Sequence, residues 1–98
     1  MTITMNQNGT ALEIALEGRL DTTTAPELEK TLKETLGGVE QLTLNFEKLD
    51  YISSAGLRVL LSAHKIMSGK GSMKVTNVNE VVREVFDVTG FADILTIE

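Results

Sequence analysis

The spacing of hydrophobic residues changes several times along the chain, and this alternation restricts the fold more than any other feature. Between residues 11 and 17, leucine and isoleucine alternate with polar or small residues, which is typical of a strand with one solvent-exposed face. Leu28, Leu32 and Leu36 instead recur every four residues, as in an amphipathic helix. Over the whole 98 residues, such patterns predict the order strand, strand, helix, strand, helix, strand, helix, strand.

This order predicts an α/β fold. Strands that alternate with helices are joined by right-handed crossovers into a parallel sheet. The first two strands differ, because Asn8-Gly9 between them favours a type I′ hairpin turn, in which both central residues have positive φ. We therefore expect a mixed, mostly parallel sheet of about five strands, with an N-terminal antiparallel hairpin and helices packed on it. The length corresponds to a single domain, residues 1–98.

Local signals predict where helices begin and end. Thr24–Glu27 has the form of a capping box, with Pro26 in the first turn of the helix that follows. Gly37-Gly38 is expected to close this helix. Asn79 is the predicted N-cap of the third helix, and Gly90 is its predicted end.

Further boundaries follow from places where the hydrophobic spacing breaks. Gly18–Asp21 interrupts the second strand pattern and is expected to end that strand. Glu47–Asp50 is expected to form a loop after the third strand. Helical spacing begins at Leu57 and has a wide apolar face, which predicts a helix packed deeply against the sheet. Ile94–Ile97 is the predicted final strand.

Composition excludes several kinds of site. The chain has no cysteine and one histidine, His64, so a disulfide, a thiolate zinc site or a multi-histidine metal site cannot form. It has 14 acidic and 9 basic residues, no basic cluster and no tryptophan, which argues against nucleic-acid binding. No apolar run is long enough for a membrane span and no signal peptide is recognisable, so we expect a cytoplasmic protein without membrane insertion.

No catalytic arrangement is visible either. The chain has neither a P-loop nor a G-x-S-x-G motif. His64 lies two to three turns beyond Ser53 and Ser54 on the same predicted helix, so it cannot meet either hydroxyl across a cleft. We expect a protein that is not an enzyme and needs no cofactor or metal.

The segment Asp50–Leu57 is unusual, because it places two hydroxyl groups where the most apolar helix begins. One interpretation is that Ser53 or Ser54 caps an unpaired amide at the helix start. The other is that a helix N-terminus favours a phosphate, since its free N–H groups and positive dipole end stabilise negative charge. A serine at this position could accept a phosphoryl group without unfolding the helix. The residues alone leave both interpretations open.

Four segments together resemble a known family. Leu16–Asp21, Leu42–Phe46, Ile52–Leu57 and Val85–Phe91 are similar, in order and spacing, to the characteristic segments of bacterial STAS-domain anti-sigma factor antagonists. The resemblance extends over almost the entire chain. It implies the STAS fold and a regulatory role in protein binding.

The resemblance also implies a mechanism. In this family the unmodified antagonist binds an anti-sigma factor that is also a serine kinase of the histidine-kinase-like ATPase type, and so releases a sigma factor. Phosphorylation of the antagonist by that kinase ends the interaction, and a PP2C-type phosphatase reverses it. By alignment, the phosphoacceptor is Ser54, and Asp21 corresponds to an acidic recognition residue. The partner-binding residues implied in this way are Asp21, Ser53, Ser54, Ala55, Gly56 and Arg58.

The chain departs from the family pattern at three positions. Ser53 stands where the best-known members have Asp, Ala55 where they have a second hydroxyl residue, and Arg58 where many have Gly. Ser53 is therefore a competing phosphoacceptor, and Arg58 could pair with a phosphate on Ser54. The alternative function is that of a non-phosphorylated STAS partner subunit of a transporter ATPase or another signalling complex.

Overall fold

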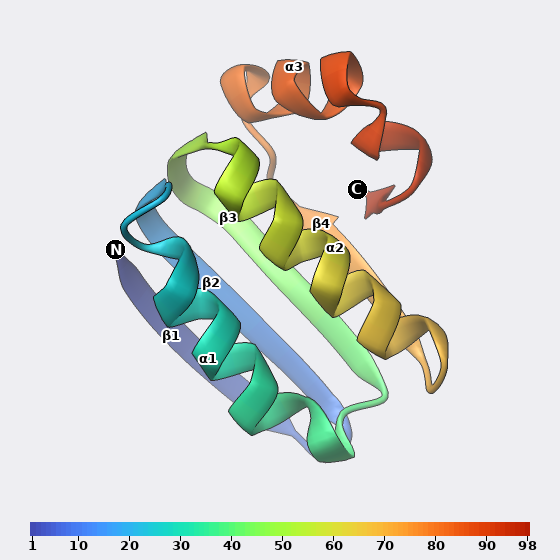
Figure 1. The fold of residues 1–98 in the computed structure, drawn as a ribbon. Helices are drawn as coiled ribbons and strands as arrows, with labels where there is room; N and C mark the ends of the chain where they lie inside the picture. Colours follow the sequence, from blue (N-terminus) through green and yellow to red (C-terminus); the bar gives the residue numbers. More distant parts are fainter.

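The computed structural model describes residues 1–98, and its helices and strands follow the predicted order (Figure 1). The elements are β1 (Thr2–Asn8), β2 (Ala11–Leu20), α1 (Ala25–Thr35), β3 (Gln41–Ile52), α2 (Ser54–Ser68), β4 (Ser72–Thr76), α3 (Glu80–Thr89) and β5 (Thr96–Ile97), with short 3₁₀ turns η1 (Leu36–Gly38) and η2 (Phe91–Asp93).

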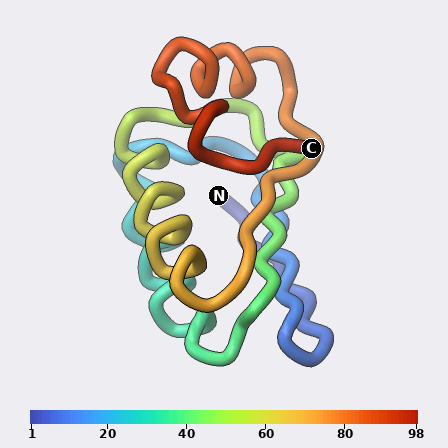
Figure 2. Tube along the Cα trace, turned by 90° about the vertical axis from the view of Figure 1, so that its right-hand side faces the viewer, coloured from blue at the N-terminus to red at the C-terminus, as the bar shows by residue number.

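The five strands form one sheet in the order β1-β2-β3-β4-β5. β1 is antiparallel to β2 and every other pair is parallel, which confirms the mixed, mostly parallel sheet with an N-terminal hairpin. Because each crossover steps in the same direction and is right-handed, the connecting helices fall on one face of the sheet. Figure 1 shows α1 and α2 side by side on that face, with α3 at one end of the molecule. Figure 2, turned by 90°, shows α3 above the turn between β3 and α2.

One hydrophobic core lies between the sheet and the helices. It contains 24 buried hydrophobic residues, and no buried residue is polar or charged. Leu28, Leu32 and Leu36 are all buried, which confirms the predicted inner face of the first helix. Each such side chain contributes about 1.5–3 kcal/mol relative to an exposed one.

The hairpin turn differs from the predicted type. Asn8 pairs with Ala11 in the β1–β2 ladder, so the two central residues are Gly9 and Thr10. Only Gly9 has positive φ, at 64°, as expected for the first position of a type II′ turn. The predicted type I′ turn centred on Asn8-Gly9 is wrong, because Asn8 remains in the strand and adds one more pair to the ladder.

β3 is continuous through Glu47–Asp50, so the predicted loop is wrong. The β2–β3 register shifts twice, and β3 carries one additional residue at each shift. These bulges change the spacing of buried residues from two to three, at Phe46, Leu49 and Ile52. Gly18, at φ 105°, lies at the second shift, and β2 extends to Leu20 instead of ending there.

The C-terminal elements confirm some predictions and correct one. The side chain of Asn79 accepts a 2.8 Å hydrogen bond from the amide of Val82, and Gly90 ends α3 with φ 82°. The final strand is shorter than predicted, because the amide of Leu95 bonds to the carbonyl of Phe91 in η2. Only Thr96–Ile97 forms β5.

Candidate functional site

The C-terminal ends of β2 and β3 lie next to each other at one end of the sheet. The amide of Ser53 donates a 2.9 Å hydrogen bond to the carbonyl of Leu20. Asp21 follows Leu20 and Ser54 follows Ser53, so the turns that lead into α1 and α2 are neighbours. In open α/β sheets, the carboxyl ends of parallel strands are where functional groups commonly gather.

Ser53 is the N-cap of α2. Its backbone is extended, at φ −99° and ψ 175°, and its hydroxyl oxygen accepts a 3.4 Å hydrogen bond from the amide of Gly56. The amide of Leu57 bonds to the carbonyl of Ser53 at 2.9 Å. The helix therefore begins at Ser54, which confirms the predicted serine cap at its start, and Leu57 is the first residue of its apolar face.

Ser54 occupies the first position of α2 and is exposed. Its hydroxyl makes no hydrogen bond within the chain, in contrast to the capping hydroxyl of Ser53. The first turn of α2 contains no acidic side chain. The amides of this turn have no intrahelical partners and form the positive end of the helix dipole, so negative charge at Ser54 is favoured electrostatically.

Asp21 caps the turn that leads into α1. Its Oδ1 accepts hydrogen bonds from the amides of Thr23 and Thr24, at 3.0 and 3.2 Å, and from the Thr23 hydroxyl at 2.7 Å. The Thr24 hydroxyl accepts a 2.8 Å bond from the Asp21 amide in return. The predicted box from Thr24 to Glu27 is wrong, because Thr24 makes no side-chain cap for α1. The reciprocal pair lies three residues earlier, where Asp21 supplies the acceptor.

The Thr23 hydroxyl, together with the amides of Thr23 and Thr24, holds the pKa of Asp21 below its usual value. The other carboxylate oxygen of Asp21 lies 3.7 Å from Nε of Arg19. The Arg19 guanidinium in turn lies 4.5 Å from the centre of the Tyr51 ring. Asp21 thus remains ionised and is held by its own turn, with one oxygen directed at an exposed arginine.

Gly56 lies beneath this surface. It is buried, and a Cβ at this position would come within 2.7 Å of Leu20 Cγ and 2.8 Å of Ile52 Cγ1. The absence of a side chain therefore lets the first turn of α2 pack closely on the ends of β2 and β3. Gly56 positions Ser54, and does not itself offer surface to a partner.

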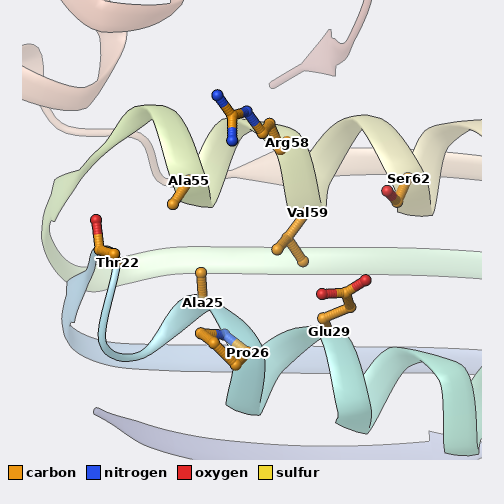
Figure 3. A pocket seen from close by; sticks show the side chains of 8 residues that line it. All are labelled: Thr22, Ala25, Pro26, Glu29, Ala55, Arg58, Val59 and Ser62. Atoms are coloured by element: carbon orange, nitrogen blue, oxygen red, sulfur yellow. The ribbon is translucent and has the colours of Figure 1, made fainter.

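A groove of about 290 Å³ runs between α1 and α2, next to the first turn of α2 (Figure 3). Ala55 and Val59 point from α2 toward Ala25 of α1, while the Arg58 guanidinium points away from α1. Arg58 is exposed and forms no ion pair within the chain. Sequence reasoning missed this groove, although small residues in the first turns of both helices are a signal for it. Its lining residues are Thr22, Ala25, Pro26, Glu29, Ala55, Arg58, Val59 and Ser62.

No other chemistry-bearing cluster appears. No three acidic or histidine side chains lie close enough together to hold a metal ion. His64 is half-buried and ten residues beyond Ser54 on the same helix, about 15 Å along the axis. No helix has both the length and the apolar character to cross a membrane.

Comparison with protein families identifies the fold. The family model of the STAS domain matches residues 2–98. The chain belongs to the STAS domain family. Among curated relatives, BtrV of Bordetella bronchiseptica, named as a candidate anti-sigma factor antagonist, is 35% identical over 99% of this chain and 85% of its own length. The anti-sigma-B factor antagonist of Bacillus subtilis is 28% identical over 97% of this chain and 88% of its own.

Solved structures show the same architecture. The anti-sigma factor antagonist SpoIIAA in its unphosphorylated form has a TM-score of 0.85 at 21% identity, covering 99% of this chain and 88% of its own. The phosphorylated form of the Bacillus SpoIIAA has a TM-score of 0.77 at 20% identity, covering 99% of this chain and 91% of its own. These similarities confirm the predicted STAS fold.

Within this STAS domain, the structure brings together most of the residues that the sequence singled out. Asp21, Ser53 and Ser54 lie on adjacent turns, with Gly56 beneath them. Arg58 lies one turn along α2 from Ser54. Sequence spacing alone gave no basis for placing Asp21 beside α2, and that expectation came from the family resemblance.

Proposed function

We propose that this STAS domain is an anti-sigma factor antagonist that binds an anti-sigma factor while unphosphorylated and is switched off by phosphorylation at Ser54. The observation that carries the proposal is the exposed, unbonded hydroxyl of Ser54 at the N-terminus of α2, beside the neighbouring Asp21 turn. The names of the sequence relatives support this function. SpoIIAA, solved in phosphorylated and unphosphorylated forms, supports the use of phosphate as a switch.

Ser54 is the better acceptor of the two adjacent serines. The Ser53 hydroxyl is partly buried and accepts the capping bond from Gly56, so transfer of a phosphoryl group to this oxygen would disturb the start of the helix. The Ser54 hydroxyl has no such bond and is exposed. A phosphate there would replace no intramolecular contact and would lie at the favourable end of the helix dipole.

The added charge can reverse an interface without changing the fold. A phosphoserine carries about −1.5 to −2 charge at neutral pH. Burying that charge against a partner is costly unless the partner supplies paired cations. A loss of about 3 kcal/mol in binding free energy weakens affinity about a hundredfold. This is sufficient for a switch.

The partners follow from the same proposal. The anti-sigma factor is a serine kinase of the histidine-kinase-like ATPase type, and a PP2C-type phosphatase restores the unmodified form. The STAS domain acts in the cytoplasm as a binding protein, not as an enzyme. The partner contacts the surface formed by Asp21, Ser53, Ser54 and Ala55, and Arg58 extends this surface by one helical turn.

The proposal is tested by incubating the purified protein with that kinase and ATP, and mapping the phosphate by tandem mass spectrometry. We expect phosphate on Ser54 in the natural protein and in Ser53→Ala, and none in Ser54→Ala. Ser62 is an exposed serine two turns along α2, so Ser62→Ala is the matched control. We expect this variant to be phosphorylated on Ser54 as the natural protein is. Phosphate on Ser53, or unchanged labelling of Ser54→Ala, would contradict the proposal.

A further inference from the structure

The outer edge of β1 is an unprotected strand edge. β1 pairs only with β2, without a register shift. Its sequence, TITMNQN, contains no charged residue and no proline. Natural sheets usually protect an exposed edge with charges, proline, bulges or very short strands. The opposite edge follows this rule, because β5 has only two residues.

The hairpin determines which backbone groups of β1 are free. In a hairpin with a two-residue turn, the residues that flank the turn exchange both hydrogen bonds, and every second pair beyond them does the same. Asn8 and Ala11 flank the turn. Ile3, Met5 and Gln7 therefore direct their amides and carbonyls away from β2, leaving three donors and three acceptors available at the edge.

The side chains of this edge suit a second strand of the same kind. Ile3 and Met5 pair with Leu16 and Ile14, so they lie on the helix-covered face of the sheet. Met5 is nevertheless 49% exposed, because no strand lies beyond it. A further strand at this edge would cover it.

We infer that β1 pairs antiparallel with β1 of a second copy of this chain, which joins the two sheets into one. An antiparallel pair of identical strands has two-fold symmetry, so each copy satisfies the free groups of the other. With Thr4 on the two-fold axis, Ile3 lies opposite Met5 of the second copy. The net charge of −5 opposes association of two copies in general, and the uncharged side chains of this strand add no local repulsion at the contact. The dimer uses neither Ser54 nor the groove between α1 and α2, so it is independent of the proposed function.

The oligomeric state tests the inference with the purified protein alone. Sedimentation velocity from low micromolar to near-millimolar concentration is expected to show a reversible monomer–dimer equilibrium. Met5→Lys places a charge on the edge and should weaken dimerisation about tenfold or more. The matched control is Val88→Lys, at a position that is 79% exposed on α3, and it should leave the dissociation constant unchanged. Thermal unfolding of both variants verifies that they are folded.

Amide hydrogen exchange locates the interface. As concentration rises, the amides of Ile3, Met5 and Gln7 should become protected, whereas those of Thr4 and Asn6, already bonded to β2, should not change. A protein that stays monomeric at every concentration, or a dimer weakened equally by Met5→Lys and Val88→Lys, would overturn the inference. Protection of these amides only when a different protein is added would also overturn it, because the edge would then receive a strand of another chain.

Discussion

The amide of Ser53 lies 2.9 Å from the carbonyl oxygen of Leu20, and this hydrogen bond joins the ends of two parallel strands. It fixes the Asp21 turn beside the first residue of α2. Three features stabilise this end of the sheet: the cap at Ser53, the packing of Gly56 and the carboxylate of Asp21. Each can be tested separately.

Ser53→Ala and Ser54→Ala should differ in stability. Ser53→Ala removes the capping acceptor for the Gly56 amide and is expected to lower the free energy of unfolding by about 0.5–1 kcal/mol. Ser54→Ala removes an exposed hydroxyl without a partner, so its effect should stay within about 0.5 kcal/mol. Urea titrations measure both. Equal losses would show that Ser54 has a structural role that the proposed switch does not include.

Gly56→Ala is expected to destabilise the protein by about 1–3 kcal/mol, because the new methyl group meets Leu20 and Ile52 at less than 3 Å. Gly69→Ala is the control. No atom lies within 4 Å of a Cβ at that position, and its φ is −88°, so the variant should be neutral or more stable by about 0.4–1 kcal/mol. Thermal unfolding compares the two. If Gly56→Ala were as stable as Gly69→Ala, the close approach of α2 to the strand ends would be disproved.

The contribution of Asp21 should depend on pH. The Thr23 hydroxyl lowers the pKa of Asp21 in the folded protein, so the ionised carboxylate stabilises the fold above its unfolded-state pKa of about 3.9. This stabilisation is lost as the pH falls through the lowered native pKa. Asp21→Asn should therefore be less stable than the natural protein at pH 6, and the difference should shrink below pH 4. A difference in melting temperature that is constant over this range would contradict the assignment.

Asn79 holds α3 by two bonds that can be separated. Its Oδ1 caps the Val82 amide, and its Nδ2 donates to the carbonyl of Leu49, both at 2.8 Å. Asn79→Ala loses both bonds and should cost about 1–2 kcal/mol. Asn79→Asp keeps the cap and loses only the donor. Its free energy of unfolding, measured by denaturant titration, should therefore lie between those of the natural protein and Asn79→Ala. An Asn79→Asp variant no more stable than Asn79→Ala would assign the whole effect to the bond with Leu49.

Local signals predicted much of the fold because their physical causes are local. The face of Leu28, Leu32 and Leu36, the cap at Asn79 and the left-handed Gly90 each depend on a few neighbouring residues. The C-terminal half of β3 was missed because two bulges give Phe46, Leu49 and Ile52 a spacing of three. That spacing follows from pairing with β2, which is distant in sequence.

The same distinction applies to the candidate site. Hydroxyls at a helix start were visible in the sequence, and the family resemblance pointed to Ser54 as the phosphoacceptor. Local signals did not decide which serine caps the helix, because that depends on which hydroxyl the backbone turns toward Gly56. The role of Asp21 as the cap of its own turn was also missed. The misleading signal was Thr24 followed by Glu27, whereas the reciprocal pair begins with Asp21.

Phosphate on Ser54 is proposed to end binding to the anti-sigma factor. The most direct measurement compares the dissociation constants of the unphosphorylated protein and the protein phosphorylated only at Ser54, by isothermal titration calorimetry with that anti-sigma factor. We predict tight binding of the unphosphorylated form and affinity about a hundredfold weaker after phosphorylation, equivalent to about 3 kcal/mol. Equal affinity of the two forms would contradict the account.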